Sequence, residues 1–141
     1  METFGLLLDG IFTSLQWFNL GLLIFGCLVG LFVGAMPGLG SVNGVAILIP
    51  ITFIVPPTAA IIFLAAVYYG AMYGGAISSV MLGIPGASTA VATVFDGRPL
   101  AQKGDAITAL SAAAVGSFVG GTVSVILFTL FAPPLAEVAL A

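Results

Sequence analysis

Charge is what this sequence has least of. Only 5% of its 141 residues are Asp, Glu, Lys or Arg, whereas a soluble domain has about 25%, so the chain cannot cover a surface that faces water. No charge lies between Gly10 and Phe95, and none between Ala106 and Ala136. Because roughly 20 apolar residues cross the hydrocarbon of a bilayer, the sequence predicts an integral membrane protein.

Other shortages exclude other classes. Two basic residues and a pI of 4.1 give no electrostatic surface for nucleic acid. Histidine is absent, and the acidic and basic side chains lie outside the apolar runs, which disfavours an intramembrane enzyme. The single cysteine, Cys27, cannot form a disulfide within the chain. The acidic start, residues 1–10, lacks the basic region of a signal peptide, so we expect the first apolar segment to be retained.

The lengths of the apolar runs predict an all-α membrane protein with a single transmembrane domain over residues 1–141. Residues 1–16 form an interfacial lead-in, and Trp17 suits the headgroup level, where aromatic rings settle. Proline and glycine then divide the chain into three predicted transmembrane helices, which cover residues 17–36, 58–84 and 106–131.

The apolar segment 42–55 lies between the first two predicted helices. Its 14 residues would make a helix of about 21 Å, which is too short to cross, and Pro50 interrupts it. We therefore expect a half-helix or re-entrant segment that does not cross the membrane.

The most hydrophilic stretch is residues 96–105, which we expect to be a loop that opens with the turn Asp96-Gly97-Arg98-Pro99. Both basic residues, Arg98 and Lys103, lie in it, and basic loops tend to stay in the cytoplasm, so a cytoplasmic loop is expected. Asp105 is a good N-cap for the last helix, and Pro133-Pro134 should end that helix.

Small residues recur at every fourth position in each predicted span, which would let helix backbones approach closely within lipid. The three stripes are Gly26, Gly30 and Gly34; Ala66, Gly70, Gly74 and Ser78; and Thr108, Ala112, Gly116, Gly120 and Ser124.

Two breaks resemble each other: the run 36–41 and the run 84–89 both read apolar-Pro-Gly followed by small or hydroxyl residues. Freed backbone groups are costly in hydrocarbon unless protein buries them or they line a wet cavity. Transporters use such breaks as binding sites, in which helix N-termini hold anions and carbonyls hold Na⁺. The alternative is that each Pro-Gly only ends a helix at the membrane surface. The candidate binding residues are Pro37, Gly38, Gly40, Ser41 and Asn43 in the first break, and Pro85, Gly86, Ser88 and Thr89 in the second.

Five motifs in order resemble the large membrane subunit of tripartite tricarboxylate transporters, the TctA-type family, and the likeness covers roughly Gly30 to the C-terminus. They are Gly34-x-x-Pro37-Gly38-Leu39-Gly40, Tyr69-Gly70-x-x-Tyr73-Gly74-Gly75, Pro85-Gly86, Asp96-Gly97-x-Pro99 and Lys103-Gly104.

The resemblance implies uptake of citrate-like tri- and dicarboxylates across the bacterial inner membrane, driven by a Na⁺ or H⁺ gradient and without an organic cofactor. It implies three partners besides the carboxylate: a periplasmic solute-binding protein, a small membrane subunit and the lipid bilayer. The family's large subunit is longer, so the chain is similar to its N-terminal portion. The family pattern leads us to expect an Asn near Gly83, and this sequence has none there. The competing interpretation is a membrane scaffold or truncated fragment that only packs with other subunits.

Overall fold

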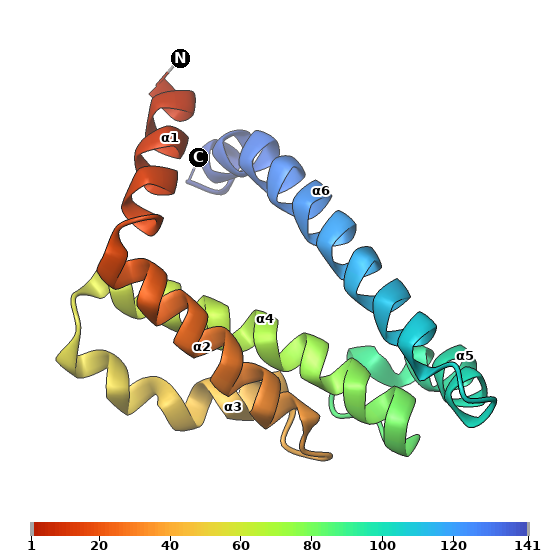
Figure 1. Ribbon diagram of the computed structural model, residues 1–141. Helices are drawn as coiled ribbons and strands as arrows, with labels where there is room; N and C mark the ends of the chain where they lie inside the picture. Colours follow the sequence, from red (N-terminus) through yellow and green to blue (C-terminus); the bar gives the residue numbers. More distant parts are fainter. Residues whose placement is uncertain (1, 141) are drawn as a thin grey trace.

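The computed structural model describes residues 2–140, which contain helices and no strand (Figure 1). The elements are α1 (Glu2–Ser14), α2 (Trp17–Ala35), α3 (Gly40–Leu48), η1 (Ile49–Ile54), α4 (Pro57–Leu82), η2 (Ser88–Ala90), α5 (Val91–Gln102) and α6 (Ala106–Leu140).

Three helices among the described residues are long and apolar enough to cross a membrane: α2, α4 and the stretch Ala106–Ala132 of α6. Three long apolar helices are therefore present as predicted, and their ends differ from those of the predicted spans by at most two residues; their crossing of the membrane stays a prediction. α4 is the central helix, since it contacts α2, α3, α5 and α6.

Helices α2 and α4 pack through three buried glycines of α2, Gly26, Gly30 and Gly34. A Cβ at Gly26 would lie 2.8 Å from the carbonyl oxygen of Phe63, and a Cβ at Gly30 would overlap the backbone of Val67. The two helices contact backbone to backbone, so the predicted close packing is confirmed for this pair.

The order of these contacts gives the relative direction of the two helices. As the position advances by four from Gly26 to Gly30, the contact on α4 also advances by four, from Phe63 to Val67. α2 and α4 are therefore parallel. If both helices cross the membrane, the segment that joins them, residues 36–56, must return across it.

α3 and η1 run back alongside α2 in Figure 1. The nine residues of α3 rise about 14 Å, and the six residues of η1 add about 12 Å because a 3₁₀ helix rises more per residue. Together they nearly match the 19-residue α2, which is about 28 Å long. A shorter apolar helix is present as expected. The re-entrant course of 42–55 stays a prediction, and the parallel packing of α2 and α4 favours a return across the membrane instead.

The expected turn at residues 96–99 is wrong, because these residues lie within α5 and Pro99 is inside the helix. The missing side chain of Gly97 lets α5 lie against Val80 of α4, where a Cβ would come within 2.7 Å of a valine methyl group. This packing outweighs the local turn preference. Only the short connection 103–105 remains between α5 and α6.

α6 begins at Ala106 as predicted, and Asp105 just before it accepts a 2.6 Å hydrogen bond from the hydroxyl of Thr108. The helix does not end at the two prolines but continues to Leu140. A proline removes one hydrogen bond and can bend a helix without ending it. α6 diverges from α4 in Figure 1, and no atom lies within 4 Å of a Cβ added at Gly116 or Gly120. Gly116 and Gly120, two residues of its small-residue stripe, therefore have no close packing partner among the described residues.

α1 covers most of the predicted lead-in and turns sharply into α2 (Figure 1). The buried Asn19 fixes this elbow, because its side-chain amide donates a 2.8 Å hydrogen bond to the carbonyl of Thr13. Trp17 is 90% exposed at the elbow, and its place at the headgroup level stays a prediction.

Candidate functional site at the two Pro-Gly breaks

The first break is the turn between α2 and α3. Gly38 and Gly40 have φ angles of 90° and 70°. Residues other than Gly, Asn and Asp rarely adopt this left-handed backbone conformation. α3 then begins at Gly40, and no side chain caps its N-terminus. The first N–H groups of a helix have no partner within it, so this helix start offers free donors.

The second break begins at Gly83, where α4 ends in the left-handed conformation with φ 74° and the Gly83 N–H donates to the carbonyl of Ser79. The chain then folds back along α4. A Cβ at Gly86 would overlap the carbonyl oxygen of Gly34 at the end of α2, and it would lie 2.7 Å from the hydroxyl of Ser78. Only glycine fits at this point.

The structure brings the two breaks together. A Cβ at Gly40 would lie 3.6 Å from the carbonyl oxygen of Gly86, so the start of α3 lies beside the second break. Because Gly86 also touches Gly34, both breaks lie at the level of the last turn of α2. Gly86 also contacts Gly75 of α4. Because α4 ends at Leu82, seven residues later, the breaks lie about 10 Å inside the end of that helix.

The other candidate residues are distributed around this contact. Ser41 is only 6% exposed. Asn43 and Pro37 are exposed, as is Ser88 at the start of η2, which also has no side-chain cap. The structure does not show Asn43 joined to the second break.

Thr89 faces a different space from Gly86. It lines a cavity of about 340 Å³ together with Thr93 of α5 and Ser117 of α6, and its hydroxyl lies 3.7 Å from the sulfur of Met72. The residues of the first break do not line this cavity. The second break therefore presents Gly86 to α2 and α3, and its threonines to α6.

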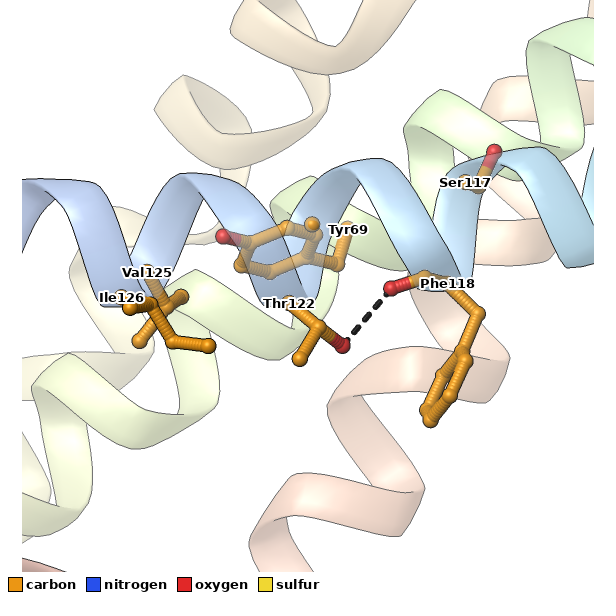
Figure 2. A pocket seen from close by; sticks show the side chains of 7 residues that line it. Tyr69, Ser117, Phe118, Thr122, Val125 and Ile126 are labelled. Atoms are coloured by element: carbon orange, nitrogen blue, oxygen red, sulfur yellow. Dashed lines mark hydrogen bonds between the residues drawn. The ribbon is translucent and has the colours of Figure 1, made fainter.

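A larger cavity lies elsewhere, between α4 and α6 (Figure 2). It has a volume of about 450 Å³, and Tyr69 lines it opposite apolar and small residues of α6. The hydroxyl of Thr122 donates a 2.8 Å hydrogen bond to the carbonyl of Phe118 in its own helix, as Figure 2 shows. The cavity thus offers little to an anion, and we place the candidate site at the breaks.

Comparison with known proteins decides the family. The model of the tripartite tricarboxylate transporter TctA family matches residues 20–141. The chain belongs to the TctA family. It is 43% identical over 131 residues to an Agrobacterium vitis protein described as an uncharacterized 52.8 kDa protein in the TAR-I ttuC' 3' region. This match covers 93% of the chain but 26% of the relative, so the chain spans about a quarter of the relative's length. No solved structure matches the chain.

The structure gathers the TctA motifs identified in the sequence. A Cβ at Gly86 would overlap the Gly34 carbonyl and would lie 2.8 Å from the Cα of Gly75, so three of the five motifs meet at one point. Tyr73, from the same motif as Gly75, donates a 3.2 Å hydrogen bond to the carbonyl of Leu110 and thereby joins α4 to α6. The glycine at position 83 keeps the left-handed backbone that Asn can also adopt, so this departure preserves the local conformation.

Three side chains that the sequence did not indicate as part of the site lie at the second break. Ser79 is fully buried, and its hydroxyl lies 2.7 Å from the Gly75 carbonyl and 3.1 Å from the Ala90 carbonyl. Ser78 touches Gly86, and Arg98, expected in a solvated loop, donates to the carbonyl of Met81. Two adjacent serines in an apolar helix were the available signal, since buried hydroxyls need partners. In the described part of the chain, no three His, Cys, Asp or Glu side chains gather as they would around a metal ion.

Proposed function

We propose that this TctA chain forms the membrane-spanning substrate path of an ion-gradient-driven uptake transporter for citrate-like tri- and dicarboxylates, and that the paired breaks bind the carboxylate. The contact between Gly40 and Gly86 carries the proposal. It places the start of α3, which no side chain caps, beside the second break, and a helix N-terminus attracts anions through free N–H groups and the helix dipole.

The composition of this region supports a site built from backbone groups. No Lys or Arg occurs before Arg98, and the Arg98 guanidinium donates to the Met81 carbonyl while its side chain lies against Gly83. A carboxylate between the breaks would therefore be bound by N–H groups and hydroxyls. Glycine at positions 38, 40 and 86 lets a ligand approach the backbone. Carbonyl oxygens of the same breaks are suitable ligands for Na⁺, and we propose Na⁺ or H⁺ as the coupling ion.

The proposal includes partners and location. As a member of a tripartite family, the subunit would work in the bacterial inner membrane with a periplasmic binding protein and a small membrane subunit. The rest of a chain the length of the A. vitis relative would complete the path, because this chain corresponds to 26% of that protein.

The test is carboxylate uptake by the complete transporter carrying Ser41→Ala or Gly40→Ala, at matched membrane expression. A hydrogen bond to a charged group contributes about 1.5–3 kcal/mol, so Ser41→Ala should weaken apparent affinity by about tenfold or more. Gly40→Ala should be worse, because it also strains a left-handed backbone. Ser111→Ala, an exposed serine of α6, is the matched control.

Two other outcomes would count against the proposal. Normal affinity and rate in the Ser41, Gly40 and Ser88→Ala variants would make the breaks simple helix ends and place the site elsewhere. Loss of assembled complex with unchanged affinity in the remaining complexes would favour the scaffold interpretation.

A further inference from the structure

Arg98 lies on the end of α4, next to the second break. Its guanidinium donates a hydrogen bond to the carbonyl of Met81, one of the last carbonyls of the helix. Its side chain also covers Gly83, where an added Cβ would lie 3.4 Å from Nε and 3.5 Å from Cγ and Cδ. A cation is favourable at a helix C-terminus, where unpaired carbonyls and the dipole present negative charge.

Three consecutive residues of α4 contact α5 or Ala90, the residue before it, and the contact of Arg98 is the last of the three. The hydroxyl of Ser79 contacts the Ala90 carbonyl, Val80 packs on Gly97, and the Met81 carbonyl accepts from Arg98. The residues that connect these contacts along the chain, between Met81 and Ala90, contain the second break. The break is therefore a loop closed at its base, with Gly86 and Ala87 at its inner end against Gly75.

We propose that Arg98 is a positioning residue that clamps this loop and so holds Gly86 in place against the first break. The alternative is that Arg98 acts only through its positive charge. Lys103 serves as the control that distinguishes this alternative from the clamp. Lys103 is the other basic residue of the chain; it is exposed one position after α5, and no hydrogen bond of its side chain is found within residues 2–140. Neutralising either residue changes the net charge equally, but only Arg98 contacts α4.

The first measurement needs no substrate. Ala87→Cys places a thiol at the half-buried tip of the loop, beside Gly75, in a full-length transporter without other cysteines, with Cys27 replaced by Ser. In membrane vesicles, a small permeant maleimide should label this thiol slowly. Arg98→Gln should raise the labelling rate by about tenfold, because loss of a charge-assisted hydrogen bond increases undocking by that factor or more. Lys103→Gln should leave the rate unchanged.

The second measurement is uptake, and this part rests on the proposed function. Arg98→Gln should raise the apparent KM for the carboxylate more than it lowers kcat, and Lys103→Gln should change neither. Arg98→Lys, which keeps the charge but loses the planar fork of donors, should label at an intermediate rate and partly restore KM. It also carries the test if Arg98→Gln fails to reach the membrane.

The outcomes separate the two proposals. If Arg98→Gln and Arg98→Lys label no faster than Lys103→Gln, Arg98 does not hold the loop, whatever happens to KM. If labelling accelerates while KM stays normal, Arg98 positions the break as proposed, and the binding of carboxylate at the break is refuted instead.

Discussion

Gly30→Ala should separate the two central helices. Gly30 lies midway along the contact between α2 and α4, and the new Cβ would overlap the carbonyl oxygen, carbonyl carbon and Cα of Val67. All three are backbone atoms of a helix, so no side-chain rotation can relieve the overlap. The helices must instead move apart, which also loosens the neighbouring contact at Gly26.

Two opposing contributions set the size of the effect. Forcing an extra carbon into a well-packed contact costs about 1–3 kcal/mol, and overlap with rigid backbone places this site at the upper end. Alanine in place of glycine favours the helix by up to about 1 kcal/mol. A net loss of about 2 kcal/mol remains, which corresponds to a fall in Tm of about 5 °C for a chain of this size.

The assay is thermal unfolding of the purified protein in mild detergent, followed by size-exclusion chromatography after heating. Gly120→Ala is the matched control: it is the same change within a long apolar helix, but no atom lies within 4 Å of the added carbon. Gly120→Ala should leave Tm unchanged or raise it slightly. An equal fall in both variants, or no fall in Gly30→Ala, would refute the claim that these backbones are in contact.

Three further predictions concern topology and the second break. If residues 36–56 return across the membrane, single cysteines at Ser41 and Val55 should be labelled by an impermeant reagent from opposite faces; labelling from one face would restore the re-entrant course. Ser79→Ala removes the hydroxyl between the Gly75 and Ala90 carbonyls and should lower stability by about 1 kcal/mol, whereas Ser14→Ala, whose hydroxyl bonds only within α1, should change Tm little. Gly83→Asn should be tolerated at φ 74°, and Gly83→Val should not, because β-branched residues are strained there; equal expression and stability of the two variants would contradict this.

Part of the site could be predicted from the sequence because it depends on local chemistry. Pro-Gly pairs interrupt helices wherever they occur, so Pro37-Gly38 and Pro85-Gly86 marked both breaks correctly. The repeated glycines of α2 predicted a close helix contact for the same reason, since a missing side chain is visible without the fold. In α6, however, Gly116 and Gly120 of the same spacing have no close partner in the described residues, because a stripe shows that close packing is possible and does not name the neighbour.

The orientation of the clustered residues could not be predicted in this way. Thr89 and Gly86 are three residues apart, yet they face opposite sides of the second break. Arg98 was assigned to a solvated loop from its polar neighbours, and it became a contact of α4 only because α5 continues through Pro99. That continuation depends on the packing of Gly97 against Val80, a contact between residues far apart along the chain.

The sequence by itself determined that this protein lies in lipid and which of its segments are long enough to span a bilayer. With 5% charged residues and long apolar runs, the chain must bury its surface in lipid or protein, and helix length follows from bilayer thickness. Only the tertiary structure decided direction and contact. Length alone made 42–55 too short to cross, whereas the parallel contact of α2 with α4 favours its return, because a segment that joins two parallel spans has to reach the face where the second one begins. The meeting of Gly40 with Gly86 follows from that same packing and from no local signal.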